Sequence, residues 1–114
     1  MSIKRDYKIK FDLHKNDLIK TNMIFDDVDI KTSDFSMYVY RDGELIDITD
    51  VKGTLYIMNP KGERMNIEVE NKGDYFYIIL PSEYIAEVGT YRAALSLVKG
   101  PKRVILNQFE YKVI

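Results

Sequence analysis

The sequence contains no cysteine and no tryptophan, and only one of its 114 residues is a histidine. Without cysteine the chain has no disulfide, no thiolate metal ligand and no cysteine nucleophile, so its stability must come from packing alone. The single histidine would have to serve every catalytic triad that the serines suggest. These absences disfavour most hydrolase and metal-site chemistry.

Long apolar runs and an excess of one charge are also missing. The chain has 17 basic and 18 acidic residues, a net charge of −1, and therefore no global field that would attract nucleic acid or an anionic membrane. No segment approaches the ~18 consecutive apolar residues of a membrane span, and the charged start, Met1–Asp6, does not resemble a signal peptide. We expect a soluble protein made in the cytoplasm, with neither nucleic acid nor membrane as a partner.

The length of 114 residues predicts one domain over residues 1–114. A domain of this size buries roughly two-thirds of its unfolded surface, which suffices for a single core. No linker, repeat or low-complexity segment divides the chain.

Glycine turns interrupt the chain at intervals of roughly 8–12 residues with some longer gaps, a spacing typical of β-sandwiches and barrels. The turns are Asp42-Gly43, Asn59-Pro60-Lys61-Gly62, Asn71-Lys72-Gly73-Asp74, Val88-Gly89 and Lys99-Gly100-Pro101. Glycine reaches the positive φ angles of tight turns, and Asn, Asp and Pro favour the flanking conformations. The sequence predicts an all-β fold, an immunoglobulin-like antiparallel β-sandwich.

Alternating apolar residues place strands between these turns. Residues 4–13 and 64–70 each have one apolar face and are expected at sheet edges. The run 75–80 is apolar on both faces and is expected to be a central strand or one covered by a partner. The sequence of residues 81–87 predicts one short helical turn. This segment is expected to cross from one sheet to the other. A change of phase near residues 106–108 predicts a β-bulge.

Tyr91 narrows the prediction to an immunoglobulin-like sandwich. In such domains a tyrosine near the start of the sixth strand bonds back to upstream backbone, and Tyr91 follows Gly89 at the matching place. The position two residues later, a cysteine in antibody domains, is Ala93. An ordinary packed tyrosine is the alternative. The residues predicted to matter are structural turn and corner positions: Gly43, Pro60, Gly62, Gly73, Gly89 and Tyr91.

Candidate chemical groups are sparse. His14 has no second metal ligand nearby in the sequence. The acidic residues Asp26, Asp27, Asp29 and Asp34 lack the glycine and the terminal glutamate of an EF-hand loop. A solvated, charged loop is therefore favoured over a calcium site. No serine lies in a Gly-x-Ser-x-Gly elbow, and no glycine-rich loop joins a strand to a helix. We predict no catalytic, cofactor-binding or metal-binding residue.

Nine tyrosines are the most distinctive part of the composition. Tyrosine is favoured where a surface meets a partner or stacks on sugar rings, but it is also a common strand residue. Those in or beside predicted strands are Tyr38, Tyr40, Tyr56, Tyr75, Tyr77 and Tyr84. They would indicate a binding face only if several shared one exposed side of a sheet.

The order and spacing of turn and core residues resemble the N-terminal domain of phage baseplate upper proteins. The resemblance runs from about Tyr7 to Val113 and rests on Ile24-Phe25, Asp29–Thr32, Phe35–Met37, Asp42–Thr49, Leu55–Gly62, Leu80-Pro81 and Gly89–Tyr91. Each element is unspecific by itself. No catalytic or cofactor residue is carried over, because the matched positions are structural.

This resemblance implies a structural virion protein of a long-tailed phage that infects a Gram-positive host. The domain is expected to dock into the tail-tip baseplate, to be assembled in the bacterial cytoplasm, and to connect to a receptor-binding protein. The family's longer C-terminal part, commonly oligomeric, is missing from this chain, so we expect either a fragment or a short relative.

Two other functions remain open. An immunoglobulin-like carbohydrate-binding or adhesion module would use clustered tyrosines to stack on sugars. An enzyme would need a deep pocket lined by acidic groups of perturbed acidity and is the least supported class.

Overall fold

The computed structural model describes residues 7–13, 18–26 and 33–114, which form nine strands and one short 3₁₀ helix. The strands are β1 (Tyr7–Asp12), β2 (Ile24–Phe25), β3 (Asp34–Arg41), β4 (Glu44–Leu45), β5 (Lys52–Met58), β6 (Arg64–Asn71), β7 (Phe76–Ile79), β8 (Gly89–Lys99) and β9 (Lys102–Val113). The 3₁₀ helix η1 (Ser82–Tyr84) joins β7 to β8. The predictions of an all-β fold and of a helical turn within residues 81–87 are confirmed.

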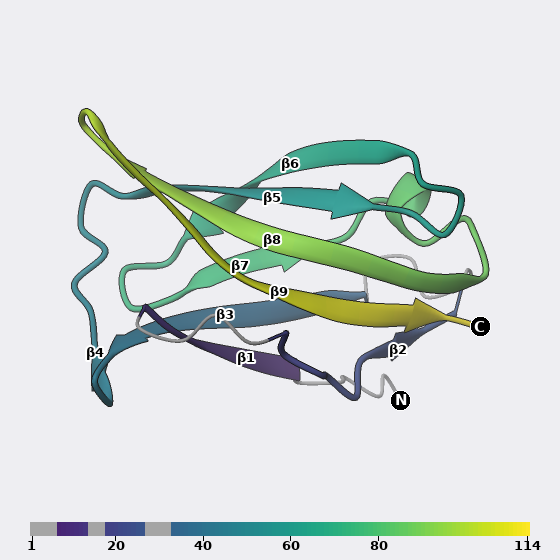
Figure 1. Ribbon diagram of the computed structural model, residues 1–114, viewed down its shortest axis with the longest axis horizontal. Helices are drawn as coiled ribbons and strands as arrows, with labels where there is room; N and C mark the ends of the chain where they lie inside the picture. Colours follow the sequence, from purple (N-terminus) through teal and green to yellow (C-terminus); the bar gives the residue numbers. More distant parts are fainter. Residues whose placement is uncertain (1–6, 14–17, 27–32) are drawn as a thin grey trace.

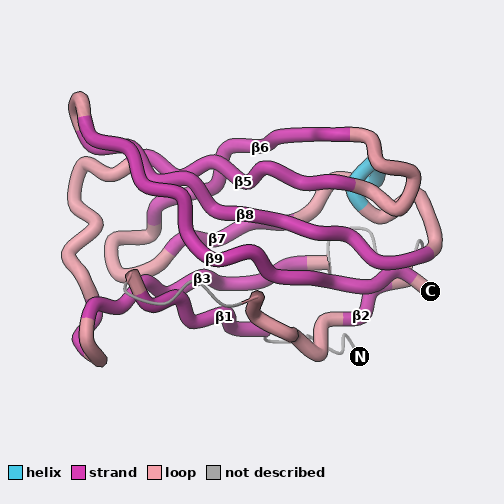
Figure 2. Tube along the Cα trace, in the orientation of Figure 1, coloured by secondary structure: helices cyan, strands magenta, loops and turns pink. Residues whose placement is uncertain are grey.

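The strands form a curled sheet in the order β1-β3-β7-β6-β5-β8-β9-β2, with β4 paired to the end of β3. The curl produces two layers, visible in Figure 1 and Figure 2. We call β1, β3, β4 and β7 the first sheet and β5, β8, β9 and β2 the second sheet. Strand β6 pairs with β5 through Arg64–Val69 and with β7 through its last two residues, so it belongs to both. The arrangement is compatible with a sandwich or half-barrel.

Two strand pairs are parallel, which corrects the expectation of a wholly antiparallel sheet. Strand β1 runs parallel to β3, and β2 runs parallel to β9. Parallel neighbours need a long crossover connection, and the segment between β1 and β3 provides one. It crosses to the second sheet, where Ile19 and β2 lie beside β9, before the chain returns to start β3.

The core lies between the two layers and is rich in aromatic rings. Phe109 of β9 lies at its centre, in edge contacts with Phe11 of β1 and Phe35 of β3, each at a centroid distance of 5.7 Å. All three rings are at most 1% exposed. Strand alternation explains this, because every second residue of β1, β3, β8 and β9 faces the opposite layer.

Other strand predictions had mixed outcomes. Strand β7 is central and β1 is at one end of the strand order, as expected. Residues 64–70 are not at the end of the sheet, because β6 lies between β5 and β7 in the strand order. Their alternating pattern arises because one face of β6 faces the core and the other faces solvent, which an interior antiparallel strand also allows. The bulge is confirmed: Ala94 pairs with Gln108 and Ser96 with Ile105, so two residues of β9 lie opposite one of β8.

Gly53 was not among the residues singled out from the sequence, yet the structure leaves no room for a side chain at this position. It pairs with Val69 on β6, and a Cβ at this position would be 2.7 Å from Val69 Cγ2 and 3.1 Å from the ring of Phe76. The residues on either side of Gly53 do not indicate a turn. Its role is to leave room for Val69 and Phe76, which are distant in the sequence and approach it only in the folded chain.

Replacing Gly53 with alanine is expected to destabilise the fold by about 1–3 kcal/mol, because the added methyl overpacks the core. Gly62→Ala is the matched control. Its φ of +84° is strained for alanine, but nothing lies within 4 Å of the new methyl, so its cost should be smaller, about 1 kcal/mol. Urea unfolding of both variants measures the difference, and equal losses would contradict the packing role of Gly53.

Candidate functional site

The turns that contain the predicted residues lie at the two ends of the molecule: the β3–β4 and β6–β7 turns at one end, and the β5–β6 turn and the start of β8 at the other (Figure 1). Gly43 and Gly73 lie at one end, with φ angles of +85° and +98°, and Gly62 and Gly89 lie at the other, with +84° and +136°. Only glycine takes such angles without strain. The structure thus brings together Pro60, Gly62, Gly89 and Tyr91, and separates them from Gly43 and Gly73.

Pro60 and Gly89 are in close contact. A Cβ on Gly89 would be 2.9 Å from the Pro60 ring, so glycine is needed here for space as well as for φ. Lys61 and Glu87 join the same two segments through an ion pair of 3.1 Å. The turn between β5 and β6 therefore packs firmly on the segment that leads into β8.

Tyr91 makes the bond expected of a corner tyrosine. Its hydroxyl accepts a hydrogen bond of 2.9 Å from the backbone N–H of Glu87. Its ring stacks on that of Tyr111 at 4.8 Å, and the Tyr111 hydroxyl donates to the Tyr84 carbonyl at 2.8 Å. Burial raises the pKa of both Tyr91 and Tyr111, which keeps the two hydroxyls neutral. These contacts stabilise the crossover and offer no reactive group.

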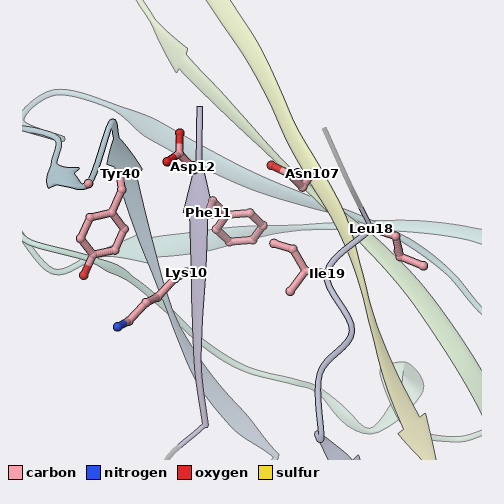
Figure 3. A pocket seen from close by; sticks show the side chains of 8 residues that line it. Lys10, Phe11, Asp12, Leu18, Ile19, Tyr40 and Asn107 are labelled. Carbon is pink, nitrogen blue, oxygen red and sulfur yellow. The ribbon is translucent and has the colours of Figure 1, made fainter. Parts of the chain in front are cut away.

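A pocket of about 400 Å³ lies beside β1, where the curled sheet does not close (Figure 3). Phe11 and Ile19 face each other across it, and Lys10, Asp12, Tyr40 and Asn107 also line it. Opposite β1, Ile19 donates its backbone N–H to the Gln108 carbonyl at 2.8 Å. Among the described residues that line this pocket, Asp12 is the one carboxylate, so they do not form the acidic pair that glycoside hydrolysis uses.

Four tyrosines share the outer face of the first sheet, which we call the tyrosine face. The rings of Tyr38 and Tyr75 stack at 5.1 Å, and all four members, Tyr38, Tyr40, Tyr75 and Tyr77, are half-buried. Lys10 lies over the Tyr40 ring at 6.0 Å and Lys72 over the Tyr77 ring at 5.8 Å.

The remaining strand tyrosines lie elsewhere. Tyr84 is buried and donates to the Asn66 carbonyl at 2.8 Å. Tyr56 is 43% exposed on the outer face of the second sheet, where it contacts Arg103. Sequence patterns did not identify Arg103 as a candidate binding residue. The alternation of inward and outward side chains along β9, corrected for the bulge, would have placed it on the outer face.

Within the tyrosine face, Tyr77 donates its hydroxyl proton to Asp34 Oδ2 at 2.6 Å. Burial, followed by this hydrogen bond and the nearby charge of Asp34, raises the pKa of Tyr77 to about 12. In the unfolded chain the group ionises near 10. The neutral hydroxyl therefore stabilises the fold fully below pH 10, and this contribution is lost as the pH rises to about 12.

We expect the free energy of unfolding to fall more steeply with pH in the wild-type chain than in Tyr77→Phe over that alkaline range, because the variant has no proton to lose there. Urea unfolding at a series of alkaline pH values measures both slopes. Tyr40→Phe is the control. It removes a hydroxyl from the same face, leaves the hydrogen bond between Tyr77 and Asp34 intact, and should follow the wild type. Identical slopes for wild type and Tyr77→Phe would contradict the assignment.

The metal-site candidates are only partly covered by the structure. His14, Asp27 and Asp29 lie outside the described residues. Among those that are described, no three His, Asp or Glu side chains gather closely enough to hold an ion. No helix in the described part of the chain is long and apolar enough to cross a bilayer.

Comparison with known proteins agrees with the residue pattern. The family model of the BppU N-terminal domain, the N-terminal domain of the phage baseplate upper protein, matches residues 5–114. The chain belongs to this family. Baseplate upper proteins are structural components of the phage tail, so a structural role in the virion tail or baseplate follows, in association with other tail or baseplate proteins.

A solved structure supports the fold independently. The N-terminal domain of phage TP901-1 ORF48 superposes with a TM-score of 0.72 at 13% identity, over 95% of this chain and 97% of that one. At this identity the similarity establishes the shared fold alone. No curated protein matches the chain.

Proposed function

We propose that this domain docks into the tail-tip baseplate and supports or connects the receptor-binding apparatus, without catalysis. The observation that carries the proposal is the family match over residues 5–114, nearly the whole chain. The proposed partners are other baseplate proteins, including a receptor-binding protein, with assembly in the host cytoplasm. A homo-oligomer of the full-length protein is part of the same proposal.

The geometry supports docking in two ways. The two layers enclose one aromatic core, which makes a rigid body. Strand β1 stands at the end of the strand order, so a partner strand can extend the sheet there, and the adjoining pocket can receive a side chain from it. The backbone of such an added strand would supply affinity, and the pocket would supply selectivity.

One exposed carboxylate, that of Asp47, is not suited to act as a general acid. Glu44 and Asp47 share a shallow depression at the end of the first sheet. The pKa of Asp47 is lowered by hydrogen bonds from the Thr49 hydroxyl, at 2.7 Å, and from its backbone N–H, at 2.9 Å. A carboxylate held in its charged form by a local turn is a poor proton donor.

The decisive experiment is to delete the gene from the phage that encodes it. Particles assembled without the protein should have altered tail tips and should adsorb to host cells poorly, whereas complementation should restore both. Mass spectrometry of purified wild-type particles should detect the chain. Its absence from purified particles, or normal tail tips and adsorption after deletion, would overturn the proposal.

A second candidate, carbohydrate binding, is favoured by one observation: four tyrosines share the outer face of the first sheet, and the accessible face of an aromatic ring can pack against a sugar ring. A glycan array followed by calorimetry tests it. If the face binds sugar, Tyr38→Ala should abolish the heat signal and Tyr56→Ala, on the other sheet, should retain it. We expect no specific glycan if the domain is a pure docking scaffold.

A further inference from the structure

The outer face of the second sheet presents four rows of side chains across its strands. The register places Met58 of β5 beside Arg92 of β8, Tyr56 beside Ala94, and Thr54 beside Ser96. The same rows extend onto the neighbouring strands. We call this surface the arginine face; its members are Arg64, Met58, Arg92 and Glu110, then Asn66, Tyr56, Ala94 and Gln108, then Glu68, Thr54, Ser96 and Ile105, then Lys52, Val98 and Arg103.

One arginine of this face is held in place by its neighbours. Arg103 donates through Nε to Ser96 Oγ at 3.2 Å and through Nη2 to the Tyr56 hydroxyl at 3.1 Å. Its guanidinium lies 5.7 Å from the centre of the Tyr56 ring. Guanidinium has five N–H groups, so these two bonds leave donors for a further acceptor. A fixed arginine loses little freedom on binding, which favours affinity.

The face carries more positive than negative charge. Its cations are Arg64, Arg92, Arg103 and Lys52, and its two carboxylates are already paired with two of them. Lys52 contacts Glu68 at 2.9 Å and Arg92 contacts Glu110 at 3.4 Å. The positive surplus therefore rests on Arg64 and Arg103, which lie on opposite sides of the row formed by Tyr56 and Ala94.

Apolar surface lies between these charges. A depression of about 530 Å³ is lined by Tyr56, Met58 and Ala94, and Arg64 and Arg92, from the row beside Met58, also line it. The small alanine side chain explains the hollow, because its larger neighbours rise around it. Met58 is 38% exposed, and Ile105 on the adjoining row is 62% exposed. Tyrosine, methionine and arginine are the residues enriched at protein interfaces.

We propose that the arginine face binds a protein segment that inserts an apolar side chain into the depression over Ala94 and places carboxylates beside Arg64 and Arg103. Charge complementarity selects an acidic partner, and the exposed apolar side chains select a protein surface over a nucleic-acid backbone. This inference rests on the proposed function and deepens it, since it assigns a docking surface and the chemistry of what docks there.

Photo-crosslinking in assembled phage tests the surface. The photoreactive amino acid p-benzoylphenylalanine is placed at Ala94, at Met58 on the rim, and at Ile79 as the control. Ile79 is 46% exposed on the outer face of the first sheet. We expect positions 94 and 58 to crosslink to another tail protein, through a peptide with Asp or Glu beside an apolar residue, and position 79 to give no such product.

Each other outcome overturns the proposal in a different way. Particles that contain the chain but crosslink from position 79 alone would leave the proposed function intact and reject the arginine face. Crosslinks from position 94 only to a second copy, to nucleic acid or to a peptide without acidic residues would reject the acidic partner. Particles that lack the chain altogether would overturn the proposed function, and the arginine face with it.

Once the crosslinked partner has been purified, its affinity for charge variants of this domain tests the role of Arg103. Arg103→Gln should weaken binding about tenfold, as expected for losing a hydrogen bond to a charged group, and should reduce the dependence of affinity on salt. Arg41→Gln, an exposed arginine of the first sheet, removes the same charge elsewhere and should bind as the wild type does. Equal weakening by both variants would reject a specific role for Arg103.

Discussion

The two layers enclose the core because β6 pairs with a strand of each sheet. Its first six residues pair with β5, and Glu70 and Asn71 pair with β7. The Asn71 side chain donates to the carbonyls of Ile48, at 2.8 Å, and Val51, at 3.0 Å, and accepts from the Gly73 N–H at 2.8 Å. One amide therefore ties together the loop before β5 and the turn before β7, and the two layers are held over the aromatic core.

This closure gives the domain two outer faces of different chemistry. The first sheet presents half-buried tyrosines with lysines above two of the rings, and the second presents arginines around an apolar hollow. A rigid core with distinct faces suits a part that must be held by one neighbour while it presents another surface outward. Membership of the baseplate upper protein family agrees with such a role.

Local sequence signals predicted much of this fold. Turn glycines, alternating strands, the η1 turn and the bulge near Asn107 are encoded by adjacent residues, so they could be identified without coordinates. The parallel pairing of β1 with β3 could not, because it depends on where the chain travels between them. The interior position of β6, the tight packing at Gly53 and the Arg103–Tyr56 contact also arise only when distant segments meet. The arginine face was missed for this reason.

The most direct test of the account is a cryo-electron microscopy reconstruction of the tail tip of the phage that encodes this protein, at a resolution that places strands. The account predicts this domain in the baseplate, with the outer face formed by β5, β6, β8 and β9 covered by a neighbouring protein whose acidic side chains lie beside Arg64 and Arg103. A domain located outside the baseplate, or one within it whose arginine face is bare to solvent, would contradict the account.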